Sequence, residues 1–212
     1  MQVVLDDYVW AAGVATELVN TTAEVWRGDE HLPDLAALTG FVNEHPSPAA
    51  HALGDRRVTG DTLAGLATRA RPTDLDDVHA LRVVVRDLID HPERDRLVAG
   101  ASALTASVAG VTLLAEPAEP VARTRIHWAI ALRPSATITD ALAVICGVGV
   151  LGVVHALGEQ RFRQCGAPAC CGAFIDTTRP GRRRYCMPGL CGNRVNVANH
   201  RARRAAARAG KP

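Results

Sequence analysis

Hydrophobic residues recur three or four positions apart through the first half of the chain, which is the spacing of one face of an α-helix. The pattern predicts five helices, over 8–25, 33–45, 61–70, 74–90 and 93–107. The stretch 46–60 interrupts this pattern, and because it is rich in Pro and Gly we expect an exposed loop there.

The predicted helix over 74–90 has the clearest amphipathic pattern. Its apolar positions are Leu75, Val78, Leu81, Val85 and Leu88. Thr73 stands where it could cap the first turn, and Asp76 follows three residues later, close to the arrangement of a capping box. We therefore expect this helix to begin at residue 74.

Two later stretches have the character of β-strands. Residues 111–115 form a compact apolar run, and residues 124–132 alternate, so that Ile126, Trp128, Ile130 and Leu132 point to one side. This pattern predicts an antiparallel hairpin packed on the helices. A long apolar stretch over 138–158 follows and is predicted to be a buried helix.

Composition supports a packed domain. The chain has 212 residues, of which 48% are hydrophobic and only 4% aromatic, so its core must consist mainly of Ala, Val, Leu and Ile. The N-terminus lacks the basic segment of a signal peptide, and no run reaches the ~18 unbroken apolar residues of a membrane helix. We expect a cytoplasmic protein with no membrane segment.

Five of the six cysteines lie close together near the C-terminus. Cys165 and Cys170 form one Cys-x4-Cys pair, Cys186 and Cys191 form a second, and 15 residues separate the pairs. Two such pairs supply the four thiolates of a closed tetrahedral zinc site. The alternative is a disulfide-stabilised extracellular module, which needs an oxidising compartment that the rest of the chain does not suggest.

The residues between the cysteines indicate a small fold around this metal. Short strands are expected at 172–177 and 182–186, joined into a hairpin, and Cys191 is expected to open a helix. Together with the early turn these features predict a treble-clef-like zinc module. Cys171 is expected to be a bystander, because its use would break the equal spacing of the two pairs.

Charge divides the chain at the same point. Residues 1–160 carry 12 arginines against 21 acidic residues, a net charge of −9, whereas residues 161–212 carry 12 basic residues against one acid, a net charge of +11. An acidic body with a basic appendage is typical of nucleic-acid-binding proteins, although a tail that packs on its own acidic body would look the same.

The last helix concentrates arginine on one face. At roughly 100° per residue, Arg194, Arg201, Arg204 and Arg208 fall within an arc of about 80°. Val195 and the alanines at positions 198, 202, 205 and 209 occupy a neighbouring arc, which could pack on the module or on a partner. Guanidinium groups suit contacts with phosphates and guanine edges, so we expect this face to bind nucleic acid.

Arg182, Arg183 and Arg184 form a second basic cluster on the expected hairpin. They could contact nucleic acid, or they could hold Asp176 and the thiolates in place. Asn193, at the start of the helix, could likewise bond within the module.

The body contains none of the sequence signatures of an enzyme. There is no phosphate-binding Gly loop followed by Lys, no Gly-x-Ser-x-Gly and no His-Glu-x-x-His. Cys146 sits in an apolar stretch and is expected to be a small buried hydrophobe. We therefore expect no catalytic activity.

The C-terminal motifs resemble those of the CGNR zinc-finger family. The resemblance rests on Cys191-Gly192-Asn193-Arg194 together with the first cysteine pair, Phe174-Ile175-Asp176 and Arg184-Tyr185-Cys186, and it covers about 161–204. Tyr185 stands where the family usually has Trp, and Asn196 where it usually has Lys. Leu18-Val19-Asn20-Thr21 and Leu81-Arg82 are similar to an N-terminal ABATE-type domain, whose family implies a bacterial, stress-related transcription regulator.

These inferences combine into one expected architecture. We expect a mostly helical α+β body with a small β-hairpin over 1–160, followed over 161–212 by a treble-clef-like module that holds one structural Zn²⁺. The expected function is DNA-binding transcription regulation, with the body sensing a small-molecule ligand or forming a homodimer. Binding of RNA, or of an acidic protein partner, is the alternative.

Overall fold

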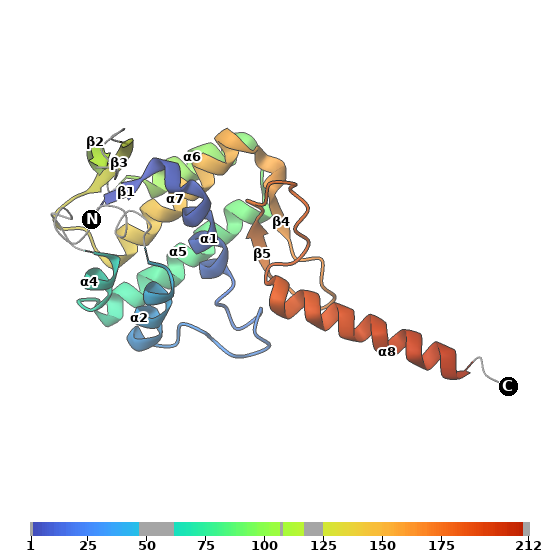
Figure 1. Cartoon of the computed structure of the whole chain (residues 1–212). Coiled ribbons are helices and arrows are strands. Elements are labelled where there is room, and N and C mark those ends of the chain that lie inside the picture. Colours follow the sequence, from blue (N-terminus) through green and yellow to red (C-terminus); the bar gives the residue numbers. More distant parts are fainter. Residues whose placement is uncertain (1, 47–61, 107, 117–124, 210–212) are drawn as a thin grey trace.

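The computed structural model describes residues 2–46, 62–106, 108–116 and 125–209. The helices are α1 (Tyr8–Val19), α2 (Leu35–Glu44), α4 (Leu63–Ala67), α5 (Pro72–Asp90), α6 (Arg94–Leu104), α7 (Ile138–Ala156) and α8 (Asn193–Ala209). The strands are β1 (Gln2–Val4), β2 (Val108–Glu116), β3 (Arg125–Leu132), β4 (Phe162–Gln164) and β5 (Ala173–Ile175). Helices α1 to α7 form a body from which α8 projects (Figure 1). Most of the predicted loop, from residue 47 on, lies outside the described residues.

Helix α7 is the centre of the body. It packs most extensively against α1 and α6, and its apolar side chains are almost all buried. Glycine permits the close approach to α1, because a Cβ added at Gly149 would lie 2.5 Å from the backbone nitrogen of Ala12. The Gly-rich character of this helix therefore reflects helix–helix packing in a core that is built, as the composition predicts, from small aliphatic residues.

Length and composition alone would allow α7 to cross a membrane. However, 67% of its most apolar window is buried inside the fold, against the other helices of the body. This burial is what a core helix requires, and it accounts for the apolar character of the segment.

The predicted β-hairpin is confirmed, with a third strand that the sequence did not reveal. β2 and β3 pair antiparallel, and β1 joins the other edge of β3, with Val3 opposite Ile130. Ile130 and Leu132 are buried, but Trp128 is 55% exposed and does not share their environment. β1 was missed because a three-residue strand carries too few positions to show an alternating pattern.

Tertiary contacts end the first helix earlier than expected. α1 stops at Val19 rather than near residue 25, and the chain turns away at Asn20 and Thr21. The Asn20 carboxamide donates to the Thr16 carbonyl, and the Thr21 hydroxyl donates to the Leu18 carbonyl, at 2.6 and 2.7 Å. Both side chains also bond to distant segments, and periodicity cannot show that.

The predicted cap of α5 is wrong. The helix begins at Pro72, and its N-cap is Arg71, whose backbone N–H donates to the Asp74 carboxylate at 2.7 Å. Proline is well suited to the first helical position because it has no N–H to satisfy. That preference displaces Thr73 and Asp76 from the roles that the sequence assigned to them.

The second sheet differs from the expected hairpin. β5 pairs antiparallel with β4, with Phe162 opposite Ile175, whereas residues 182–186 form no strand. The partner of β5 is thus the segment before the first cysteine rather than the segment before the third. All three residues of β5 are buried, and the strand packs against α1 and α5, so the module is held against the body (Figure 1).

Candidate metal centre and basic surface

The four predicted cysteines come together in one cluster. The sulfur atoms of Cys165, Cys170, Cys186 and Cys191 all lie within 4.8 Å of one another. Three of the Sγ–Sγ distances, those among Cys170, Cys186 and Cys191, are 3.7, 3.7 and 3.8 Å. A tetrahedral zinc with Zn–S bonds of about 2.3 Å places its sulfurs about 3.8 Å apart, so the cluster has the dimensions of a zinc site.

Backbone hydrogen bonds build the two turns that carry these cysteines. The Cys165 N–H donates to the Gly172 carbonyl at 2.7 Å, which closes the first turn next to β4 and β5. The second pair is set by a π-helical turn over Pro188–Gly192, in which the Cys191 N–H donates to the Met187 carbonyl at 2.8 Å. Two further N–H groups point at sulfur, since Cys186 donates to Cys165 Sγ and Gly172 to Cys170 Sγ, both at 3.4 Å.

The pKa shifts of the clustered thiols are also consistent with a metal site. Burial opposes ionisation of Cys165, but N–H groups of Cys186 and Ala167 donate to it and hold its pKa below the ordinary value. Burial and the neighbouring sulfurs raise the pKa of Cys191 to about 11 and that of Cys186 further. A divalent cation would replace these protons, because four thiolates cannot otherwise share so small a space. The donor set therefore fits Zn²⁺.

The other two cysteines stand apart from the cluster. Cys171 is exposed, and its backbone carbonyl accepts a hydrogen bond from Arg86 of α5 at 2.6 Å. Cys146 is fully buried in α7, where desolvation raises its pKa to about 12. Neither belongs to the cluster of four sulfurs.

Asp176 and Arg183 form several hydrogen bonds inside the zinc module. The buried Asp176 carboxylate accepts from the Thr178 hydroxyl and N–H and from the Arg183 N–H, at 2.6, 3.0 and 3.0 Å. Although burial opposes this, these bonds and the Arg163 guanidinium hold the pKa of Asp176 below its ordinary value. The Arg183 guanidinium donates to the Tyr185 and Cys186 carbonyls and lies 4.9 Å from the Phe174 ring centroid.

The contacts of Arg183 favour a role inside the module, and the expectation that it contacts nucleic acid stays a prediction. Its side chain is half-buried and donates to carbonyl groups of the module, and its backbone N–H, rather than its guanidinium, donates to Asp176. Arg182 and Arg184 are exposed, and the guanidinium of Arg184 lies 5.8 Å from the centre of the Tyr185 ring. Asn193 also bonds internally, to the Gly189 carbonyl at 2.6 Å.

Two residues that sequence reasoning did not place at the site hold the module against the body. Asn20 at the end of α1 accepts from the Ala173 N–H at 3.0 Å and donates to its carbonyl at 2.6 Å. A Cβ added at Gly172 would lie 2.4 Å from Cys186 Sγ and 2.7 Å from Asn20 Oδ1. The Asn-Thr motif was the available signal for Asn20, but nothing local connected it to the metal.

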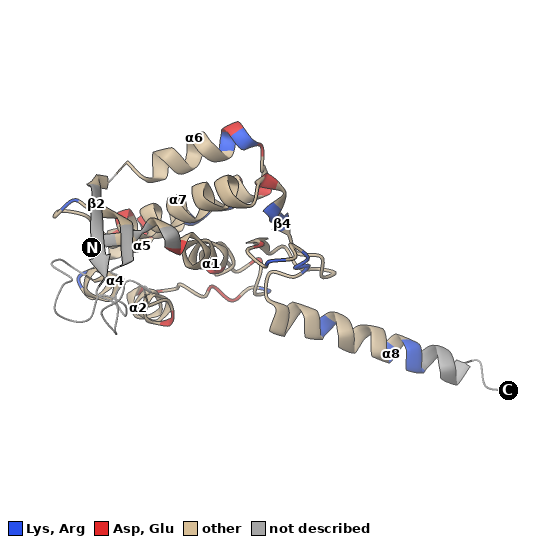
Figure 2. Ribbon diagram, turned by 45° about the horizontal axis from the view of Figure 1, so that its top comes forward, with Lys and Arg blue, Asp and Glu red and all other residues tan. Residues whose placement is uncertain are grey.

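The basic face of the last helix is open to solvent. Arg194, Arg201 and Arg204 are exposed, and within the described part of the chain none of them pairs with a carboxylate. Arg208 lies in the last turns of α8, and its side chain falls outside the described residues. Figure 2 shows basic positions along α8 and no acidic ones.

The neighbouring apolar face of α8 does not pack as one unit. Val195 packs against the metal cluster, but Ala198 and Ala202 are exposed and Val197 is 48% exposed. The helix leaves the module after its first turn and continues alone (Figure 1). Among the described residues of this face only Val195 packs on the metal cluster, whereas Ala198 lines a groove together with Val25 and Arg27 of the body.

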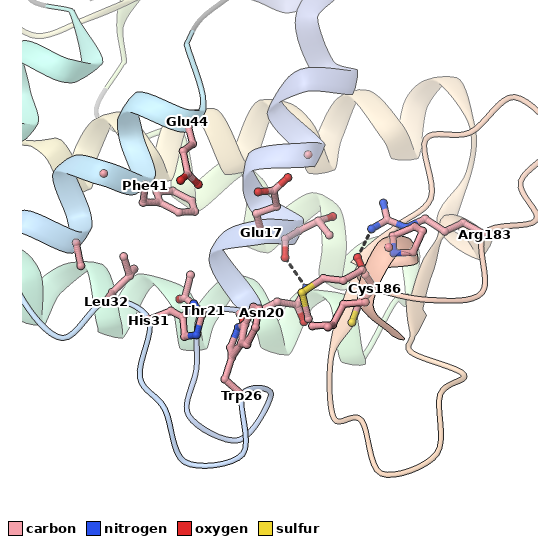
Figure 3. A pocket seen from close by; sticks show the side chains of 18 residues that line it. Glu17, Asn20, Thr21, Trp26, His31, Leu32, Phe41, Glu44, Arg183 and Cys186 are labelled. Carbon is pink, nitrogen blue, oxygen red and sulfur yellow. Dashed lines mark hydrogen bonds between the residues drawn. The ribbon is translucent and has the colours of Figure 1, made fainter. Parts of the chain in front are cut away.

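A cleft of about 590 Å³ lies where the body meets the module. Glu17 of α1 and Phe41 and Glu44 of α2 line one side, and Arg183 and Cys186 of the module line the other (Figure 3). The rings of Trp26 and His31, which also line the cleft, stack with their centroids 3.8 Å apart. A ligand in this cleft would touch both parts of the protein.

Comparison with known proteins agrees with this geometry. Residues 161–204 match the family model described as the CGNR zinc finger. No curated protein matches the chain. The similarity of the N-terminal part to an ABATE-type domain stays a prediction.

Proposed function

We propose that the protein is a DNA-binding transcription regulator, because its residues 161–204 match the CGNR zinc-finger family. The zinc module presents the basic face of α8 and the exposed arginines Arg182 and Arg184. The body holds the module in place and regulates it. In this proposal the protein is cytoplasmic and bacterial, and it has no catalytic activity of its own.

The observation that carries the proposal is the state of the arginines on α8. Arg194, Arg201 and Arg204 are exposed on a helix that lies next to the body only near its start, and none of these three has an acidic partner among the described residues. A helix with several unpaired cations and no acid repels itself, and phosphates relieve that repulsion. The same observation argues against a tail that neutralises its own body.

One structural Zn²⁺ completes the module in this proposal. Four cysteine sulfurs fill all four positions of a tetrahedral ion, so the metal would leave no place for substrate or water. Apart from the cluster, the module's core is small, and metal binding would supply folding free energy on the order of 10 kcal/mol. The ion would fix the turn from which α8 begins.

The body would supply regulation. A small molecule bound in the cleft next to Glu17 and Cys186 would contact both α1 and the module, and could change how the two pack. A homodimer would place two copies of α8 on one duplex. The molecular mass at micromolar concentration, measured with and without DNA, tests this part.

Structured RNA is the second nucleic-acid candidate, because guanidinium groups bind its phosphates equally well. An acidic protein partner is the remaining alternative. Competition of a labelled DNA duplex with unlabelled RNA, and with a polyglutamate chain that carries no phosphate, separates the three classes.

The direct test is the affinity of the zinc-loaded protein for random-sequence duplex DNA across a salt series. We expect log K to fall with log salt with a slope steeper than about −3, as contact with four or more phosphates requires. Binding should disappear after chelation of the metal. Zinc-loaded protein that ignores the duplex at low salt would show the proposal to be wrong.

A matched pair of variants tests which face of α8 binds. Arg201 and Arg203 are both exposed on the same helix, but at 100° per residue they point in nearly opposite directions. Arg201→Ala should reduce the salt slope by about 0.9, the value for one lost phosphate contact. Arg203→Ala should reduce it less. Equal effects would mean that the helix acts only through its total charge.

A further inference from the structure

The arginines of the acidic body are almost all neutralised inside it. Arg71, Arg82, Arg86, Arg94 and Arg96 each form an ion pair with a carboxylate, and Arg69 and Arg133 also have interaction partners. Arg27 is the exception among the body arginines whose side chains the structure describes. It is exposed, and it pairs neither with Glu24 or Asp29 of its own loop nor with any other described carboxylate.

The loop that carries Arg27 is held in a defined shape. Val25 is buried, and the Trp26 indole N–H donates to the Asn20 carbonyl at 2.7 Å. Arg27 itself has a φ of 62°, a left-handed conformation that is uncommon for a residue other than glycine. Such a conformation persists where the surrounding structure enforces it, and it is often found at binding sites.

This loop lies alongside the start of α8. Val25 and Arg27 of the body line a groove of about 220 Å³ together with residues of the zinc module. The module contributes the first cysteine turn, which includes Cys170, then Cys191 of the second pair, and the α8 residues Arg194, Val195, Ala198 and Asn199. The groove is therefore lined by apolar residues, by two cysteines of the metal cluster and by two arginines, one from each part of the protein.

Two cations at one groove repel each other unless an anion lies between them. The structure describes no carboxylate among the groove-lining residues, and Arg194 is as free of ion pairs as Arg27. Guanidinium groups bind phosphate oxygens through directed, charge-assisted hydrogen bonds, and the Asn199 carboxamide could add a further donor. The groove thus has the donors that a phosphodiester requires.

We propose that this groove binds a backbone phosphate of the nucleic-acid duplex, with Arg27 of the body acting together with Arg194 of α8. The inference rests on the proposed function and extends it, because it makes the body a direct part of the nucleic-acid-binding surface. The docking of body on module then sets the spacing of the two arginines. A change in that docking would alter affinity without any change in α8.

The test compares salt slopes of duplex binding for full-length, zinc-loaded variants. Arg27→Ala should reduce the slope by about 0.9, and its deficit relative to the wild type should shrink about threefold between about 50 and 200 mM salt. Arg27→Lys keeps the charge and should retain most of the slope. Arg96→Ala is the control, because it changes the net charge equally at a paired arginine of α6.

The outcomes separate the inference from the function on which it rests. A lower slope for Arg27→Ala, with Arg27→Lys and Arg96→Ala near the wild type, supports the groove. A wild-type slope for Arg27→Ala while Arg194→Ala lowers it would overturn the inference and leave the proposed function standing. Equal losses for Arg27→Ala and Arg96→Ala would also overturn it, since only net charge would then matter. Zinc content and far-UV circular dichroism confirm that each variant is folded.

Discussion

The carboxamide of Asn20 bonds to both backbone groups of Ala173, accepting from its N–H at 3.0 Å and donating to its carbonyl at 2.6 Å. The end of α1 therefore continues the sheet of the zinc module much as another strand would. Thr16, one turn earlier on α1, adds a third bond by accepting from the Ile175 N–H at 3.0 Å. This relationship couples the body to the metal centre, because Gly172, the residue before Ala173, packs directly on the Cys186 sulfur.

Removing this link should destabilise the whole protein. Asn20→Ala leaves the N–H and the carbonyl of Ala173 buried without partners, at a cost of about 1–3 kcal/mol for each group. The free energy of unfolding of the zinc-loaded protein, measured in urea, should fall by about 2 kcal/mol or more. Asn43→Ala, at an exposed position of α2, is the control and should change it by less than about 0.5 kcal/mol. Equal values for the two variants would contradict the proposed coupling.

Replacing Cys186 should abolish zinc binding, whereas replacing Cys171 should not. Cys186→Ser removes one of four sulfurs and should abolish stable binding of Zn²⁺ and the ligand-field spectrum of a tetrahedral Co²⁺–thiolate site. Cys171→Ser changes an exposed thiol outside the cluster and should leave one metal per chain. Metal analysis after dialysis measures both. Loss of zinc in the Cys171 variant would mean that the ligand set is different.

Glycines in the helices should respond in opposite directions to alanine. A Cβ added at Gly13 of α1 or Gly40 of α2 meets no atom within 4 Å, so Gly→Ala should stabilise each helix by about 0.5–1 kcal/mol. A Cβ at Gly149 of α7 would lie 2.5 Å from the Ala12 nitrogen, and backbone cannot move aside easily. Gly149→Ala should therefore destabilise by about 1–3 kcal/mol. Thermal unfolding of the three variants checks the packing of α7 on α1.

The Glu17–His45 pair should make stability depend on pH. Glu17 Oε2 lies 2.9 Å from His45 Nε2. The hydrogen bond with His45 holds the pKa of Glu17 below its ordinary value, despite partial burial. Burial opposes protonation of His45, but its hydrogen bonds to Glu17 and to the Phe41 carbonyl raise its pKa.

The signs of these two shifts define the pH window of the effect. The contribution of His45 is fully present below the ordinary histidine pKa and is lost as pH rises through the raised folded value. The contribution of Glu17 is present above the ordinary glutamate pKa and is lost as pH falls through the lowered folded value. Glu17→Gln should therefore cost up to about 1 kcal/mol near pH 5.5, and less near pH 8.5. A difference between the wild type and Glu17→Gln that does not change with pH would contradict this account, and Glu93→Gln on the surface is the control.

Local sequence was enough to locate most of the helices and the four cysteines that cluster. Helical spacing predicted α2 and α5 because each buries one continuous face, and a long apolar stretch predicted α7, which is buried on most sides. The paired cysteines indicated zinc because few other structures need two such pairs. The missed features depend on partners far along the chain. From local sequence Asn20 is only a polar residue within a predicted helix. Its partner Ala173 lies 153 positions later, so only the folded structure shows the bond. From local sequence Arg183 cannot be distinguished from Arg182 and Arg184. In the structure only its guanidinium donates to the Tyr185 and Cys186 carbonyls.

The sequence by itself determined the composition of the core, the four thiolates and the concentration of positive charge after residue 160, since each of these is a property of residue type and spacing. Only the tertiary structure decided that β5 pairs with β4, that Asn20 at the end of α1 bonds to the other edge of β5 at Ala173, and that Arg27 of the body lies at one groove with Arg194 of α8. The physical reason is that the residue type decides whether a group needs a hydrogen bond or a counter-charge. Which distant group meets that need depends on how the helices pack.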